Sequence, residues 1–120
     1  MRVIVIDDSK DMRVLLIRAA TILGYEVREA ADGLEALDIL AAGYLPDLAL
    51  VDWDMPNMNG LEFVARARQD PKLTSMKILF VTAESEQKQV VKALANGADE
   101  YLMKPFPVQT LIDCVKQLLD

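Results

Sequence analysis

Short apolar runs alternate along the chain with longer segments in which apolar residues recur at helical spacing. The first run, residues 3–6, is compact and β-branched, which is typical of a strand buried on both faces. Further apolar runs predict strands at residues 48–51, 77–81 and 100–103, and the more polar stretch 26–30 predicts a strand by a weaker signal. Because a helical segment follows each run and no long linker intervenes, the pattern predicts an α/β fold. We expect a parallel sheet covered by helices on both faces, in one domain over residues 1–120.

Helices are predicted between these runs from apolar residues three and four positions apart. Ser9 and Asp32 are expected to cap the first two helices, Gly24 and Gly43 to end them, and Gly60 to open the third. The apolar positions that define the helices are Met12, Leu15, Leu16, Ala19, Ile22 and Leu23; Leu34, Leu37, Leu40 and Ala41; Leu61, Val64 and Ala65; Val90, Val91, Leu94 and Ala95; and Leu111, Ile112, Val115, Leu118 and Leu119.

The composition is that of an acidic globular chain. Hydrophobic residues make up 52% of the 120 residues and charged residues 27%, with a net charge of -6. Nucleic acids and anionic membranes attract basic surfaces, so neither is an expected partner, whereas a cation or a basic protein face is. No apolar run approaches the ~18 residues that span a membrane, and the N-terminal run is too short for a signal peptide. We therefore expect a cytoplasmic protein without membrane insertion.

The residue types present narrow the chemistry further. Histidine, the commonest general base and transition-metal ligand, is absent. A functional site must therefore use carboxylates, hydroxyls and lysine, and carboxylates favour hard cations such as Mg²⁺. The single cysteine, Cys114, excludes an internal disulfide. It lies in an apolar-periodic stretch and is interpreted as a small core residue rather than a reactive thiol.

Polar residues follow four of the predicted strands. The first strand ends in Asp7-Asp8, and the third in Asp52 with Asp54 two residues later. The fourth ends in Thr82 and the fifth in Lys104-Pro105. Because ligands of open α/β sheets bind outside the carboxyl ends of the strands, we expect these side chains to meet in one crevice.

A cluster of carboxylates at that crevice needs compensation. Two carboxylates ~4 Å apart repel by about 4 kcal/mol at an effective dielectric near 20. Repulsion among Asp7, Asp8 and Asp52 would either raise the pKa of one of these carboxyl groups or be relieved by a bound cation. A Mg²⁺ ion at this place could also hold a phosphate oxygen. With Lys104 and Thr82 nearby, the set matches phosphoryl transfer to a carboxylate nucleophile. Taken singly, each residue has a structural explanation as a helix cap, a surface lysine or a strand end, so the joint placement carries the hypothesis.

Five stretches of the chain carry a family resemblance that covers essentially all 120 residues. Together they resemble the receiver domain of two-component response regulators, and most closely its chemotaxis type. The resemblance implies a flavodoxin-like (βα)₅ fold with a doubly wound five-stranded sheet in the order 2-1-3-4-5. The stretches are VIDDS at 5–9, DGLEAL at 32–37, DWDMPNMNGL at 52–61, VTAE at 81–84 and YLMKPF at 101–106.

The resemblance also implies residue roles. Asp52 would be the phosphoryl acceptor, taking the group from a phosphohistidine on a histidine kinase or phosphotransfer protein. Asp8 would touch Mg²⁺ directly, Asp7 mainly through water, and Asp54 through its backbone carbonyl. Lys104 would pair with Asp52 before phosphorylation and with a phosphate oxygen afterwards, next to a cis Lys104-Pro105 peptide. Such a protein is not a dedicated enzyme, although it catalyses its own phosphorylation and slow dephosphorylation.

The signal output is likewise implied by the resemblance. Thr82 and Tyr101 match the family's switch pair, in which the Thr82 hydroxyl moves to the phosphoryl group and Tyr101 fills the vacated space. The alternative for Tyr101 is an amphipathic edge residue with its hydroxyl in water. A protein target would bind the face formed by the fourth helix, fifth strand and fifth helix. The flagellar motor switch is the expected target, and the chain is expected to be a monomer. Lys88, Lys92 and Lys116 are candidates for that face.

Some positions depart from the usual chemotaxis pattern. Asp54 stands where Asn is common, and Glu84 is a second acid expected to flank the phosphoryl group. We expect both to alter the hydrolytic lifetime of the phosphoryl group. Asn59 replaces the more usual Asp before Gly60, and either residue tolerates a turn.

Other functions are also compatible with parts of the pattern. Asp52-x-Asp54 resembles the nucleophile and acid pair of haloacid-dehalogenase-type phosphatases, although there the metal acids come last in the chain. A pseudo-receiver would be a pure interaction module, which the complete acid, Thr and Lys positions disfavour. The chain could also be a stand-alone phosphorelay receiver, or a receiver excised from a longer regulator.

Overall fold

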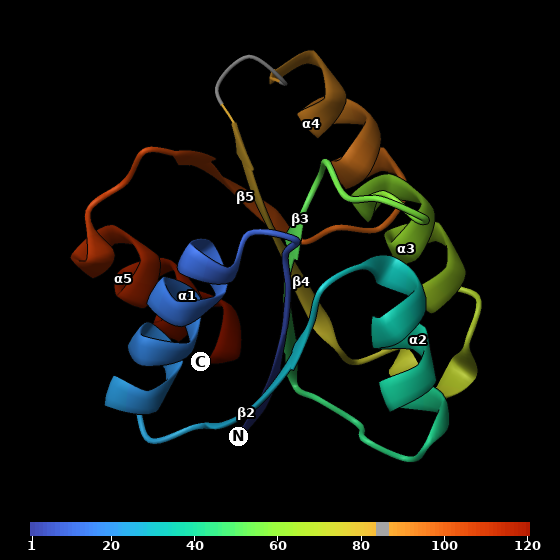
Figure 1. Ribbon diagram of the computed structural model, residues 1–120, viewed down its shortest axis with the longest axis horizontal. Helices are drawn as coiled ribbons and strands as arrows, with labels where there is room; N and C mark the ends of the chain where they lie inside the picture. The colour runs from blue at the N-terminus through green and yellow to red at the C-terminus, as the bar shows by residue number, and fades with distance from the viewer. Residues whose placement is uncertain (84–86) are drawn as a thin grey trace.

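A computed structural model describes residues 1–83 and 87–120 of the chain. Its five parallel strands form one sheet in the order β2-β1-β3-β4-β5, which confirms the predicted fold class and strand order (Figure 1). The strands are β1 (Arg2–Ile6), β2 (Glu26–Ala30), β3 (Leu48–Asp52), β4 (Lys77–Ala83) and β5 (Glu100–Lys104).

The helices follow the strands as the apolar spacing predicted. They are α1 (Lys10–Ile22), α2 (Gly33–Ala41), α3 (Gly60–Ala67), α4 (Gln87–Ala95) and α5 (Val108–Leu119), with a short 3₁₀ turn, η1 (Pro71–Leu73), that the sequence pattern did not indicate. The side chains of Ser9 and Asp32 accept hydrogen bonds from the first turns of α1 and α2, as predicted. Among the described residues, no helix is long and apolar enough to cross a bilayer.

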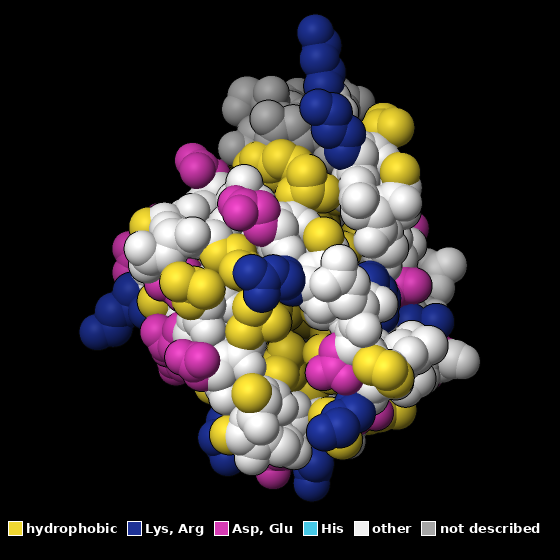
Figure 2. Space-filling model, turned by 90° about the vertical axis from the view of Figure 1, so that its right-hand side faces the viewer, with side chains coloured by type: hydrophobic (Ala, Val, Ile, Leu, Met, Phe, Trp, Pro, Cys, Tyr) yellow, Lys and Arg dark blue, Asp and Glu magenta, His cyan; other side chains and the backbone are white. Residues whose placement is uncertain are grey.

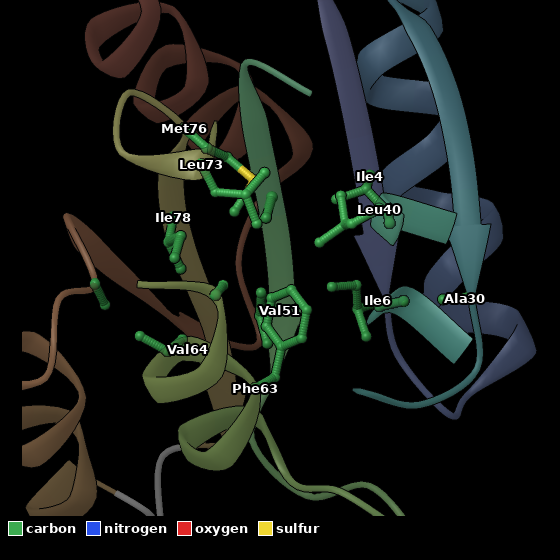
Figure 3. Packing of buried hydrophobic residues seen from close by; sticks show 14 of the residues in the cluster. Ile4, Ile6, Ala30, Leu40, Val51, Phe63, Val64, Leu73, Met76 and Ile78 are labelled. Atoms are coloured by element: carbon green, nitrogen blue, oxygen red, sulfur yellow. The ribbon is translucent and has the colours of Figure 1, made fainter. Parts of the chain in front are cut away.

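Two hydrophobic layers enclose the sheet because alternate strand residues point to opposite faces. Helices α1 and α5 cover one face, where Val3 and Val5 pack against Leu16 of α1. Helices α2, α3 and α4 cover the other face, where Ile4 and Ile6 belong to the cluster that contains Phe63 of α3 (Figure 3). Every residue of the central strand β3 is buried, including Asp52 at its carboxyl end.

The buried sides of some helices differ from the predicted ones. In α3, Phe63, Val64 and Ala67 are buried, whereas Ala65 is only half-buried. The side of the molecule formed by α2, α3 and α4 exposes hydrophobic side chains between charged ones (Figure 2). Leu34 on α2 is among the exposed apolar residues. Spacing therefore located these helices correctly but did not fully specify which side packs on the sheet.

Polar contacts, one of them buried, join loops to the strands at the amino ends of the sheet. The Tyr44 hydroxyl donates to the carbonyl of Val3 at 3.1 Å. The Asp99 carboxylate accepts from the backbone N–H of Ile78 at 2.8 Å and from the guanidinium of Arg68 at 2.9 Å. These contacts join loops to β1 and β4 at the end opposite to the predicted crevice.

Candidate functional site

The carboxyl ends of β1 and β3 lie side by side and carry the acidic residues. Ile6 pairs in register with Val51, so the following residues, Asp7 and Asp52, are brought next to each other. Asp7 is fully buried, Asp52 is 7% exposed, and Asp8 is exposed. One carboxylate oxygen from each of the three lies within 4.8 Å of the others. The structure thus brings together three of the residues that the sequence placed at strand ends.

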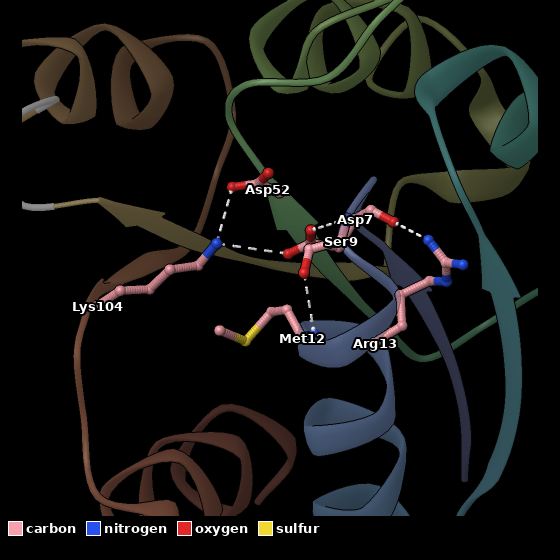
Figure 4. Close-up of polar contacts among 6 residues, drawn as sticks. All are labelled: Asp7, Ser9, Met12, Arg13, Asp52 and Lys104. Atoms are coloured by element: carbon pink, nitrogen blue, oxygen red, sulfur yellow. Dashed lines mark hydrogen bonds and ion pairs between the residues drawn. The ribbon is translucent and has the colours of Figure 1, made fainter.

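Lys104, the last residue of the edge strand β5, reaches this cluster across the end of β4 (Figure 4). Its Nζ lies 3.2 Å from Oδ1 of Asp52 and 3.5 Å from Oδ2 of Asp7. The Lys104-Pro105 peptide is cis. One ammonium group is therefore shared between two buried carboxylates.

Burial dominates the electrostatics of the two inner acids. It raises the pKa of Asp52 to about 6, with repulsion from Asp7 adding to the effect and the nearby Lys104 opposing it. Burial also raises the pKa of Asp7, against the opposing effects of the Ser9 backbone N–H and of Lys104. A carboxylate with a raised pKa binds a proton or a cation in preference to standing alone as an anion. The oxygen-only donor set is of the kind that divalent hard cations prefer, so the cluster could hold such a cation.

Asp7 is held by contacts from several parts of the chain. Its backbone N–H donates to the carbonyl of Ala30, the last residue of β2, at 3.1 Å. Its Oδ1 accepts from the backbone N–H of Ser9 at 2.8 Å. Its carbonyl accepts from the guanidinium of Arg13 on α1. Arg13 was not among the predicted site residues, because a lone arginine in a helix carries no signal about a carbonyl six residues earlier.

The backbone of Asp52 is equally constrained, by the start of α3. Gly60 donates its N–H to the carbonyl of Trp53 at 2.8 Å. A Cβ atom on Gly60 would lie 2.3 Å from the carbonyl oxygen of Asp52 and 2.8 Å from the ring of Phe80. Asn59 caps α3 in a capping box with Glu62, a role that the sequence analysis missed by treating Asn59 only as a turn former. The glycine is needed because the helix begins directly against the strand end.

The remaining predicted site residues lie around the cluster. Thr82 is 1% exposed in β4, and Tyr101 of β5 pairs in register with Phe80 and is half-buried. Asp54 is exposed in the loop after β3, and its carboxylate is not part of the acidic cluster of the described residues. Glu84 lies outside the described residues. The lysines proposed for the output face, Lys88, Lys92 and Lys116, are all exposed.

A comparison with protein-family models decides the class. The model of the response regulator receiver domain matches residues 3–116. The chain belongs to this family. Receiver domains are phosphoacceptors of two-component signalling and interact with a histidine kinase or phosphotransfer protein and with a downstream target. The family match displaces the haloacid-dehalogenase-type phosphatase as an interpretation of Asp52-x-Asp54.

Several chemotaxis proteins and receiver domains are similar to this chain in sequence or structure over nearly its whole length. A chemotaxis protein CheY homolog of Campylobacter jejuni is 38% identical over 120 residues, which cover 99% of this chain and 92% of the relative. Chemotaxis protein CheY1 of Helicobacter pylori is 37% identical, with 99% and 97% covered. The structure of the chemotaxis response regulator CheY4 of Vibrio cholerae superposes with a TM-score of 0.90 at 35% identity, covering 98% of both chains. A CheY-like receiver domain protein of Methanospirillum hungatei also reaches 0.90, at 31% identity, covering 99% of this chain and 93% of that one.

Proposed function

We propose that residues 1–120 act as one receiver domain, which takes a phosphoryl group from a partner's phosphohistidine onto the carboxylate of Asp52 with Mg²⁺ bound beside it. The observation that carries this proposal is the buried Asp52 carboxylate between Lys104 and the acids Asp7 and Asp8. Its raised pKa marks a charge that the protein alone does not fully compensate.

The proposed chemistry is an in-line displacement at phosphorus. A carboxylate oxygen of Asp52 forms the new P–O bond while the P–N bond of the phosphohistidine breaks, and the imidazole leaves with the electron pair. Lys104 then pairs with a phosphoryl oxygen. Asp7, Asp8, Asp52 and the backbone carbonyl of Asp54 would hold Mg²⁺, which supplies neutralisation of the charge shared by the phosphoryl oxygens and carboxylates. Attack by water later restores the Asp52 carboxylate and releases inorganic phosphate.

We propose that Thr82 and Tyr101 transmit the change to a target bound on α4, β5 and α5. The Thr82 hydroxyl would turn to the phosphoryl group, and the Tyr101 ring would move inward. Burial of Thr82 beside the carboxyl end of β4 and the half-buried position of Tyr101 support this assignment. The names of the chemotaxis relatives favour a chemotaxis pathway. As its target we propose the flagellar motor switch, which the family resemblance implied. Affinity capture of binding proteins by the chain with bound beryllofluoride, a phosphoryl mimic, compared with capture without it, tests which partner binds.

The test of Mg²⁺ binding uses Trp53, which adjoins Asp52 and whose ring centre lies 5.6 Å from that of Phe80. We expect its fluorescence to change on addition of Mg²⁺ and again on addition of beryllofluoride, a phosphoryl mimic. Asp52→Asn should lose the second response. No response of the wild type to either addition would contradict the proposal.

The covalent step is tested by mass. Incubation with phosphoramidate, a small donor with the same P–N bond, should add the mass of one phosphoryl group in the presence of Mg²⁺, located at Asp52. Asp52→Asn should remain unmodified. Phosphorylation at another residue, or equal labelling in EDTA, would refute the assignment.

We further propose that Asp54 and Glu84 set the lifetime of the phosphoryl group through their acidic side chains. Asp54→Asn and Glu84→Gln should change the rate of dephosphorylation, measured as release of inorganic phosphate from the purified phosphoprotein. A rate equal to that of the wild type in either variant would remove the role of that residue.

A further inference from the structure

The carbonyl of Asp7 belongs to the peptide group that joins Asp7 to Asp8, two of the three clustered acids. β1 ends at Ile6, and Asp7 is fully buried. The Asp7 N–H still pairs with β2 through the carbonyl of Ala30. Its carbonyl instead accepts a hydrogen bond from Nη1 of Arg13 (Figure 4). Since a buried carbonyl needs a donor, Arg13 supplies what the end of the sheet pairing leaves open.

Arg13 is itself fixed at a second point. Its Nε donates to Oε1 of Glu29 at 3.0 Å, and Glu29 lies in the edge strand β2 in register with Val5. The side chain of Arg13 is 15% exposed, compared with 55% for Glu29. The planar guanidinium therefore bridges the edge strand and the β1–α1 turn, a geometry that a single ammonium group does not reproduce.

The other contacts of Asp7 hold different atoms. Ser9 binds one carboxylate oxygen and Lys104 faces the other. Arg13 binds the peptide oxygen, and the orientation of that peptide plane sets the direction in which the exposed Asp8 side chain leaves the backbone. The Arg13 contact is thus the one that acts on the position of Asp8 relative to Asp7 and Asp52.

We propose that Arg13, anchored by Glu29, is a positioning residue for the cation site and sets its Mg²⁺ affinity by orienting the Asp7–Asp8 peptide. This inference rests on the proposed Mg²⁺ site. Groups that orient metal ligands typically change metal affinity by roughly 10-fold to 100-fold when they are removed.

The positive charge of Arg13 would weaken Mg²⁺ binding, whereas its positioning role would strengthen it. The direction in which Mg²⁺ affinity changes on substitution therefore tells the two apart. A positive charge near the site disfavours Mg²⁺, so if charge were its main influence, Arg13→Met would tighten binding and Glu29→Gln would weaken it. A positioning role predicts that both substitutions weaken binding. It also predicts that the double variant binds no more weakly than Arg13→Met alone, because each single change breaks the same bridge.

The experiment titrates Mg²⁺ into the full chain and follows Trp53 fluorescence for the wild type, Arg13→Met, Glu29→Gln and the double variant. Arg18→Met is the matched control, because Arg18 is exposed on the same helix. We expect the dissociation constant to rise roughly 10-fold or more in Arg13→Met. We expect a smaller rise in Glu29→Gln, and none in Arg18→Met. If Arg13→Met does not fold, Arg13→Lys keeps the charge but not the bridge and should also bind Mg²⁺ more weakly.

An unchanged or tighter dissociation constant in the folded Arg13 variant would overturn this inference, as would additive effects of the two single substitutions. Wild-type protein that shows no Mg²⁺ response would instead overturn the proposed site and this inference with it. Because the wild type is titrated first, the two failures are distinguishable.

Discussion

Replacing Asp52 with asparagine should stabilise the folded chain in the absence of divalent cations. The substitution keeps the shape of the side chain and removes a charge that is buried beside Asp7. Loss of the contact with Lys104 acts against this gain, but the raised pKa of Asp52 shows that burial and the like charge outweigh the lysine. The functional site therefore carries a charge that weakens the fold.

The magnitude follows from the pKa. A carboxyl whose pKa rises from 3.8 to about 6 on folding favours the protonated state in the folded chain. At about 1.36 kcal/mol per pH unit, the ionised form destabilises the fold by about 3 kcal/mol near pH 7. Because the folded pKa is the higher one, the penalty is fully present above about pH 6, falls to roughly half near pH 5, and vanishes below the unfolded pKa of about 3.8.

Urea denaturation in EDTA, followed at several pH values, measures this difference directly. The free energy of unfolding of Asp52→Asn should exceed that of the wild type by about 3 kcal/mol near pH 7, with the gap closing as the pH falls. Asp38→Asn, at an exposed position of α2, removes the same charge and should show no such gap. Mg²⁺ should narrow the gap by stabilising the wild type more. A variant that is less stable than the wild type near pH 7, or a gap independent of pH, would refute the reasoning.

Three further predictions concern the site and its supports. The Mg²⁺ dissociation constant, from Trp53 fluorescence, should increase by up to about 10-fold per pH unit below the Asp52 pKa of about 6, because a proton competes for the same carboxylate; a constant value would contradict this competition. Gly60→Ala should destabilise the fold by about 2–3 kcal/mol in urea denaturation, because its Cβ meets the Asp52 carbonyl; a wild-type midpoint would show that α3 can move away. Asp32→Ala should lower the free energy of unfolding in urea denaturation by about 1–2 kcal/mol, through loss of the α2 cap and of the contact with Asn57. Since these contacts lower the pKa of Asp32, this cost should persist above pH 3.8 and fade below it, and a cost absent near pH 7 would exclude the cap.

The fold was predictable because β1, β3 and β4 are compact apolar runs and the helices have apolar residues at helical spacing, while the more polar β2 gave a weaker signal. The meeting of Asp7, Asp8 and Asp52 followed from one topological rule, that the carboxyl ends of parallel strands share an edge. The cis Lys104-Pro105 peptide was expected from the family resemblance alone.

Features that depend on side-chain direction were not predictable in this way. The sequence placed Leu61, Val64 and Ala65 on one side of a helix, whereas α3 buries Phe63, Val64 and Ala67, because the packing angle on the sheet decides which side faces inward. The contact of Arg13 with the Asp7 carbonyl joins an atom common to every residue to a flexible side chain, so no residue pattern marks it.

The fastening at the amino ends of the strands has a consequence for how the chain can change over time. Tyr44 binds β1 at Val3, which is in register with Leu48, four residues before Asp52 and so about 13 Å away along the strands. Free energies of substitution usually add beyond roughly 7–10 Å. Gains or losses of stability at that end can therefore accumulate independently of the phosphate chemistry. A lineage, or a protein engineer, can offset the cost of the buried acids at one end of the sheet by substitutions at the other, and leave the signalling site untouched.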